Sequence, residues 1–274
     1  MGDPYRHVKI EQHGPVLWVA LNRPEVRNAF NQTMIAELTT LFSGADAGGD
    51  ATAVSPLDTA HVRAVVLGGT GDMFSAGADL TWMQETAGYS RYDNEVDAQR
   101  LASMFDAIEG CPVPVIARVN GAALGGGVGL VASCDIAIAA EGTIFGFTEA
   151  RLGIAPAVIS PYVLRAIGPR QARALFVTGE RFGAERAERL GLVHRVVPAA
   201  ELDEAVQQAL SGILECGPAA IRACKRLTAE VPLLGRREAR TFTVETIAAL
   251  RASDEGQEGM AAFLEKRKPL FATS

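Results

Sequence analysis

The stretch that decides the fold is PVPVIARVNGAALGGGVGLVASCDIAIAA, residues 112–140. A β-branched run ends at Asn120-Gly121, and three consecutive glycines, Gly125–Gly127, precede small and apolar residues that suit a buried helix. Asp135 closes this segment, and a second apolar run follows it. The pattern predicts a strand, a turn, a helix and a second strand, with the helix beginning at the glycines.

The glycine run offers free backbone N–H groups that a ligand can approach closely. Such groups at the start of a helix attract negative charge, although a tight packing turn between helix and strand remains an alternative. A second loop of small residues, 75–78, also leads from a strand toward a helix. Two N–H groups that converge from different loops form an oxyanion hole, which suits a thioester carbonyl that becomes an enolate. The signatures of P-loop proteins, Rossmann dinucleotide sites and serine hydrolases are absent from the sequence.

Outward from this stretch, strands and helices alternate up to about residue 200. We expect a hairpin over residues 8–21, a helix capped by Asn31 and a surface loop at 44–60. Only helices are predicted after residue 200, over 201–216, 218–230, 236–252 and 254–267. The sequence therefore predicts an α/β core over residues 1–200 and a helical region over residues 201–274 that can pack on a neighbouring subunit.

The composition excludes several classes of protein. The chain has 274 residues, of which 48% are hydrophobic, and a formal net charge of −6. This charge argues against a nucleic-acid partner, and the lack of a long apolar run argues against a membrane span. The start of the sequence has no secretory signal and the four cysteines form no C-x-x-C pair, so we expect a cytoplasmic protein. The four histidines have no metal-ligand spacing, so we expect no metal site.

Glu149 is the strongest candidate for acid–base chemistry. It follows two phenylalanines in an apolar segment, where burial would raise the pKa of its carboxyl group; a surface or capping role is the alternative. Asp79 fits a helix cap, and Asp135 fits a buried acceptor for backbone N–H groups. Arg151 could pair with a substrate carboxylate or with a nearby acid. The basic residues 266–268 could complement a helix end or meet phosphates.

Five motifs together resemble the crotonase, or enoyl-CoA hydratase/isomerase, superfamily. They are NRPEVRNAF (22–30), FSAGADL (74–80), VNGAALGGGVGLVASCDIAIA (119–139), FGFTEARLGI (145–154) and EGMAAFLEKRKPLF (258–271). The resemblance implies a ClpP/crotonase-like fold of repeated ββα units with a helical C-terminal trimerisation region. It also implies a homotrimer or a hexamer built from two trimers. The implied substrate is an acyl-CoA thioester, with no cofactor besides the coenzyme A of that substrate.

The resemblance assigns roles to particular residues. The oxyanion hole would consist of the backbone N–H groups of Ala78 and Gly126, with Glu149 as the catalytic carboxylate. The substrate would contact residues of two loops and of the glycine turn, namely Arg27, Ala29, Ser75, Ala76, Asp79, Leu80, Gly125 and Gly129. Phe263 and Lys266 match residues that reach the coenzyme A of an adjacent subunit.

One position departs from the pattern of the hydratases that use two glutamates. The first glutamate of their pattern is replaced by Gly129, and only the second, Glu149, is present. A narrower resemblance, to bacterial methylglutaconyl-CoA hydratases of leucine degradation, includes this glycine, which would leave space for a branched, carboxylated substrate. We therefore expect an enoyl-CoA hydratase-type lyase, for example acting on 3-methylglutaconyl-CoA. The alternatives are a Δ3-Δ2 enoyl-CoA isomerase that uses Glu149 alone, and an acyl-CoA-binding protein without hydratase activity.

Overall fold

The computed structural model describes residues 5–43 and 57–272, which form two compact units. The first unit comprises residues up to 111 and from 115 to 206, and the second comprises residues 112–114 and those from 207 onward. Most of the loop expected at 44–60 lies outside the described residues. No helix in the described ranges is long and apolar enough to cross a membrane.

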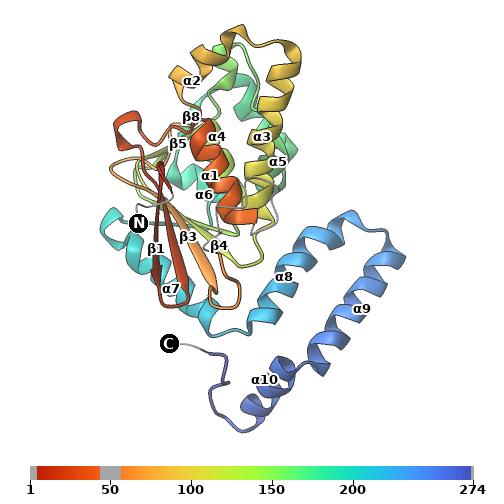
Figure 1. Cartoon of the computed structure of the whole chain (residues 1–274). Coiled ribbons are helices and arrows are strands. Elements are labelled where there is room, and N and C mark those ends of the chain that lie inside the picture. Colours follow the sequence, from red (N-terminus) through yellow and green to blue (C-terminus); the bar gives the residue numbers. More distant parts are fainter. Residues whose placement is uncertain (1–4, 44–56, 273–274) are drawn as a thin grey trace. The chain divides into compact units, whose positions relative to one another are not determined.

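The first unit is built on a sheet of six strands in the order β1-β2-β3-β4-β6-β9 (Figure 1). β1 and β2 form the expected antiparallel hairpin, and every later neighbour in this sheet pairs in parallel. The strands are β1 (Val8–His13), β2 (Val16–Leu21), β3 (Ala64–Gly69), β4 (Val115–Val119), β6 (Ile136–Ala140) and β9 (Arg195–Val197). The central strands are almost fully buried, which explains their continuous apolar runs.

A second, smaller sheet has three strands in the order β5-β7-β8: β5 (Ala122–Leu124), β7 (Ile144–Gly146) and β8 (Arg181–Gly183). β5 and β8 are not predicted from the sequence. Each has only three residues and lacks an alternating pattern, so neither gives a signal in the sequence. β5 matters for the site because it inserts a strand between the turn at Gly121 and the glycine run.

The helices of the first unit are α1 (Gln32–Ser43), α2 (Leu80–Glu85), α3 (Arg91–Glu109), α4 (Gly126–Ala132), α5 (Ser160–Thr178) and α6 (Ala184–Leu190). α1 packs against α3 (Figure 1), and its apolar residues are buried as their 3.6-residue spacing predicts. Asn31 caps α1 by accepting a hydrogen bond from the N–H of Met34 at 3.1 Å, as expected. The backbone of Gly168 inside α5 is non-helical, with positive φ, so α5 consists of two helical segments that meet at a kink.

The stretch 112–140 folds as predicted around the helix start. α4 begins at Gly126, directly after Gly125, and the apolar runs before and after it form β4 and β6. Asp135 has the expected structural role, because its carboxylate accepts a 2.7 Å hydrogen bond from the backbone N–H of Val115 and joins two parallel strands. The triple glycine is therefore the junction between the two sheets and a buried helix.

The second unit is helical, as the sequence predicts. α7 (Leu202–Leu214) leads into it, and α8 (Pro218–Glu230), α9 (Arg236–Ala252) and α10 (Asp254–Leu264) follow. α10 is three residues shorter than expected, because the chain turns at Lys266, whose φ is 55°. Its start is capped by Ser253 as expected, through a 3.1 Å bond from the N–H of Gly256. The assignment of residues 201–274 to oligomerisation stays a prediction.

Candidate active site

A cleft of about 650 Å³ in the first unit brings together most of the residues that the sequence singles out. Nine of them line it: Arg27, Ala29, Ala76, Ala78, Asp79, Leu80, Gly125, Gly126 and Glu149. They come from four separate parts of the chain, namely the loop before α1, the loop that leads into α2, the turn that begins α4 and the turn after β7. The rest of the wall is largely apolar, with Val26, Met83, Leu152 and Ile154, and it also includes Arg151 and Arg181.

The two loops expected to form an oxyanion hole are joined directly. Ser75 and Ala123 form a parallel bridge, in which the Ser75 N–H donates to the carbonyl of Ala122 at 3.1 Å and the Leu124 N–H donates to that of Ser75 at 3.0 Å. A Cβ built on Gly77 would lie only 2.6 Å from the carbonyl oxygen of Leu124. The loops are therefore in contact immediately before the two predicted donors.

Ala78 and Gly126 both line this cleft, and their backbone N–H groups lack a protein acceptor among the described residues. Among residues 5–43 and 57–272, no backbone or side-chain atom accepts a hydrogen bond from either group. Phe30 and Asp79 are by contrast paired: the Phe30 N–H donates to the carbonyl of Gly77, and the Asp79 N–H donates to that of Phe30. Two adjacent, unpaired donors on a fixed backbone can stabilise an oxyanion.

Gly125 and Gly126 must be glycine for different physical reasons. Gly125 has φ of +52°, and its N–H donates to the carbonyl of Gly146 at 2.8 Å, which ties the turn to β7. A Cβ on Gly126 would lie 2.3 Å from Cζ of the buried Phe30. The two alternatives for the glycine run, a tight packing turn and a helix start that binds an anion, are therefore compatible, because the tight packing of Gly126 holds its N–H in place.

Glu149 begins a 3-10 turn, Glu149–Leu152, that follows β7. Its Oε2 is buried and has no hydrogen-bond partner among the described residues, and burial raises the pKa of the carboxyl group, as the sequence predicts. A Cβ built on Gly125 would lie 3.2 Å from Glu149 Oε1, so this carboxyl group lies directly against the glycine turn. A buried carboxyl group with a free oxygen and a raised pKa is suited to accept a proton and return it.

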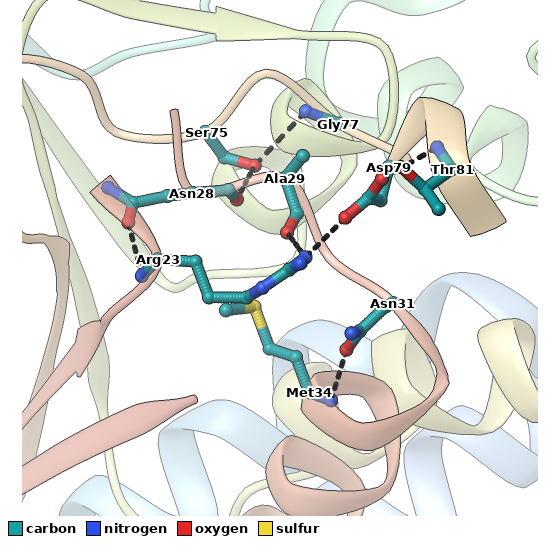
Figure 2. A network of polar contacts seen from close by, with 9 residues as sticks. All are labelled: Arg23, Asn28, Ala29, Asn31, Met34, Ser75, Gly77, Asp79 and Thr81. Atoms are coloured by element: carbon teal, nitrogen blue, oxygen red, sulfur yellow. Dashed lines mark hydrogen bonds and ion pairs between the residues drawn. The ribbon is translucent and has the colours of Figure 1, made fainter. Parts of the chain in front are cut away.

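Asp79 is both the expected helix cap and one half of a nearly buried ion pair (Figure 2). Its Oδ1 accepts from the N–H of Thr81 at 2.8 Å, and its Oδ2 lies 2.6 Å from Nη1 of Arg23. Burial alone would raise the pKa of Asp79, but the bonds from Arg23 and Thr81 outweigh burial and lower the pKa. Asp79 is therefore a charged carboxylate that is already paired.

Four residues implied by the resemblance lie away from the cleft wall. Ser75 is buried, and its Oγ donates to the carbonyl of Asn28 at 2.9 Å and accepts from the N–H of Gly77 at 3.1 Å. Phe263 and Lys266 belong to the second unit. Gly129 is buried in α4, outside the wall of the cleft.

The space expected at Gly129 does not exist. A Cβ there would lie 2.3 Å from Cγ2 of Ile159 and 2.9 Å from Cε1 of Phe105, and both of these side chains are buried. The idea that this glycine leaves room for a bulky substrate is therefore wrong. Ile159 and Phe105 fill that volume, which is why a side chain at residue 129 is excluded.

Arg151 has a partner that neither sequence-based alternative anticipated, because its Nε donates to the carbonyl of Gly179 at 2.9 Å. Sequence reasoning also passed over Arg23 and Asn28, which appeared only inside the NRPEVRNAF motif. Asn28 adopts a φ of +53°, and its side chain bonds to the backbone of residues 23, 70 and 73. In the sequence, an arginine directly before Pro24 and an asparagine directly before Ala29 were the residue types that could have indicated a polar network in this loop. Among the described residues, no group of three or more His, Cys, Asp or Glu side chains is placed to hold a metal ion.

Comparison with known proteins decides the family. The model of the enoyl-CoA hydratase/isomerase family matches residues 11–274. The chain belongs to this family. It is accordingly an enzyme of the enoyl-CoA hydratase/isomerase family with the crotonase fold, and it acts on acyl-CoA thioesters.

Several known proteins resemble the chain along almost its whole length. It is 34% identical to the crotonyl-CoA hydratase of Syntrophomonas wolfei, over 97% of this chain and 98% of that protein. AtuE of Pseudomonas aeruginosa superposes with a TM-score of 0.91 at 34% identity, over 98% of this chain and 100% of that one. An enoyl-CoA hydratase/isomerase of Marinobacter aquaeolei superposes with a TM-score of 0.88 at 35% identity, over 97% and 99% of the two chains.

Proposed function

We propose that the protein is an enoyl-CoA hydratase in which Glu149 is the only side chain that transfers protons. The observation that carries the proposal is the buried, unpaired Oε2 of Glu149, in a carboxyl group that lies against the glycine turn. The unpaired N–H groups of Ala78 and Gly126 would receive the thioester oxygen on the same cleft wall.

The proposed reaction uses one carboxylate in two consecutive steps. Glu149 first removes a proton from a water molecule while the water oxygen bonds to the β-carbon of the enoyl-CoA. The electron pair of the double bond moves to the thioester oxygen, where the two N–H groups stabilise the enolate. Glu149 then returns its proton to the α-carbon, so atoms and charge balance. The raised pKa of Glu149 suits a group that must both take and return a proton.

The filled volume at Gly129 supports a second candidate, Δ3-Δ2 enoyl-CoA isomerisation. Ile159 and Phe105 leave no room for a second carboxylate to orient water from that side. A single carboxylate suffices to move a proton from one carbon to another. The 34% identity to a protein named crotonyl-CoA hydratase favours hydration as the first candidate. An acyl-CoA-binding role without turnover is the remaining alternative.

We propose a branched, carboxylated acyl group, such as 3-methylglutaconyl, which would place the enzyme in leucine degradation. Arg27, Arg151 and Arg181 line the cleft together with the carboxyl groups of Glu25 and Glu149, and the charge of Asp79 is neutralised by Arg23, which leaves three cations against two carboxyl groups. This surplus of positive charge supports an anionic ligand, either through the phosphates of coenzyme A or through a carboxylate on the acyl group.

The proposed assembly is a homotrimer or a pair of trimers. Several large apolar side chains of the second unit are strongly exposed, namely Leu233, Phe263, Leu264 and Leu270. Such side chains favour burial against another copy of the chain. Phe263 and Lys266 would then contribute to coenzyme A binding in the neighbouring subunit.

Two assays on the purified enzyme separate these functions. Hydration is followed as loss of the conjugated thioester absorbance with crotonyl-CoA and 3-methylglutaconyl-CoA, and isomerisation as its gain with a 3-enoyl-CoA. The proposal predicts hydration as the faster reaction, with 3-methylglutaconyl-CoA the better substrate. Faster isomerisation would favour the second candidate, and binding without either reaction would overturn both.

A further inference from the structure

Arg23 lies at the centre of a polar network behind the cleft wall (Figure 2). Its side chain is only 12% exposed, and Nη1 contacts both Oδ2 of Asp79, at 2.6 Å, and the carbonyl oxygen of Ala29, at 2.7 Å. The backbone N–H of Arg23 donates to Oδ1 of Asn28 at 2.9 Å. The guanidinium group therefore joins Ala29, in the loop before α1, to Asp79, at the start of α2, while Asn28 holds the Arg23 backbone.

The same loop holds the segment that carries Ala78 at three points. The Ala76 N–H donates to the carbonyl of Arg27 at 2.9 Å, and the Phe30 N–H donates to that of Gly77 at 2.8 Å. The Asp79 N–H in turn donates to the carbonyl of Phe30 at 3.1 Å. The peptide group that contains the Ala78 N–H is thus fixed on both sides, and the Arg23–Asp79 contact adds a side-chain link between the two segments.

The charge on Asp79 creates an electrostatic problem next to this donor. Asp79 directly follows Ala78 in the sequence, its side chain is only 7% exposed, and its carboxylate lies in the wall of the same cleft. A negative charge so close to a developing enolate would oppose its formation, because the low local dielectric strengthens the repulsion. Arg23 is the cation that pairs with this carboxylate.

We propose that Arg23 is a positioning residue that neutralises Asp79 and thereby keeps the Ala78 donor effective toward a developing enolate. This inference rests on the proposed oxyanion role of Ala78. It predicts that loss of Arg23 and loss of the Asp79 charge have unequal effects on kcat. Loss of Arg23 leaves an unpaired buried carboxylate beside the hole, whereas loss of the Asp79 charge leaves a cation that still bonds to Ala29.

The test compares Arg23→Met, Asp79→Asn and the double variant. Methionine keeps much of the side-chain length without the charge, and asparagine can still cap α2 through the N–H of Thr81. The readouts are kcat and KM with crotonyl-CoA, and the absorbance of bound acetoacetyl-CoA, which forms an enolate when its thioester oxygen is stabilised. Arg118→Met is the matched control, because Arg118 pairs with Asp203 outside this cleft.

Arg23→Met is expected to lower both kcat and the fraction of bound enolate by at least about tenfold, while KM changes by less than about threefold. Asp79→Asn is expected to lower kcat by no more than about threefold, and the double variant to be more active than Arg23→Met. Arg118→Met should behave as the wild type. Equal losses in the two single variants, or a double variant no better than Arg23→Met, would mean that the pair is only a structural link.

The Asp79→Asn variant keeps the inference testable if Arg23→Met does not fold, because a tenfold loss of kcat in Asp79→Asn alone contradicts it. The enolate signal also separates this inference from the proposed function. A wild-type enzyme that binds acetoacetyl-CoA without forming the enolate would contradict the oxyanion hole itself. A normal wild-type signal that Arg23→Met leaves unchanged would contradict only the role of Arg23.

Discussion

Replacement of Gly129 by alanine should destabilise the protein, although the same substitution usually stabilises a helix. A Cβ at residue 129 would lie 2.3 Å from Cγ2 of Ile159 and 2.9 Å from Cε1 of Phe105. Comfortable contact between carbon atoms begins at about 3.5 Å, so these buried neighbours must move by roughly 1 Å. Overpacking of this kind costs about 1–3 kcal/mol of the free energy of unfolding.

The assay is urea unfolding at a fixed protein concentration, in a cycle of Gly129→Ala, Ile159→Ala and both together. Ile159→Ala alone should cost about 2–5 kcal/mol through the cavity that it leaves. The added methyl group partly fills that cavity, so the double variant should lose at least about 1 kcal/mol less than the sum. Gly212→Ala is the matched control, because the Cβ there meets no atom within 4 Å in α7 and should stabilise by about 0.5–1 kcal/mol.

A Gly129→Ala variant as stable as the wild type, or strictly additive losses, would refute this account of the site. Confirmation would mean that packing, rather than substrate size, explains the glycine. It would also mean that a second catalytic glutamate cannot be installed at residue 129 without first removing Ile159.

Four further predictions concern the site and the second unit. Gly126→Ala should lower kcat at least about tenfold, because its Cβ would lie 2.3 Å from Cζ of Phe30 and displace the N–H donor; steady-state kinetics checks this, and an unchanged kcat would contradict it. Since burial raises the pKa of Glu149, kcat/KM should fall on acidification through a pKa above that of an ordinary glutamate. For the same reason Glu149→Gln should have a higher free energy of unfolding than the wild type at neutral pH. This gain should disappear below the ordinary glutamate pKa, because Glu149 of the wild type is then protonated in both the folded and the unfolded state. Ser253→Ala should lower the free energy of unfolding by about 1 kcal/mol through loss of the cap on the Gly256 N–H, and an unchanged denaturation midpoint would count against it.

The features that sequence reasoning predicted depend on local physics. The strand–helix–strand order around Gly125–Gly127 and the caps at Asn31 and Ser253 follow from periodicity, glycine geometry and short-range hydrogen bonds. The raised pKa of Glu149 was predictable because an apolar segment of the sequence favours burial, and burial is what raises it.

The features that it missed depend on contacts between distant residues. Ile159 lies thirty positions from Gly129 along the chain, so no local pattern could show that Ile159 fills the space that a side chain at residue 129 would occupy. The Arg23–Asp79 pair joins two loops that only the folded sheet brings together. The short strand β8 forms only because β7 offers it an edge. Tertiary packing decided each of these outcomes.

The central claim is that Glu149 alone carries the proton, and the most direct measurement is single-turnover kinetics of Glu149→Gln beside its acyl-CoA affinity. Glutamine keeps the size of the side chain but cannot accept the proton. We expect turnover to fall by at least about a thousandfold, while the Kd for a saturated acyl-CoA changes by less than about threefold. Glu141→Gln, which removes an exposed carboxylate outside the cleft, is the control and should leave both values unchanged. Turnover by Glu149→Gln within tenfold of the wild type would contradict the mechanism proposed for this site.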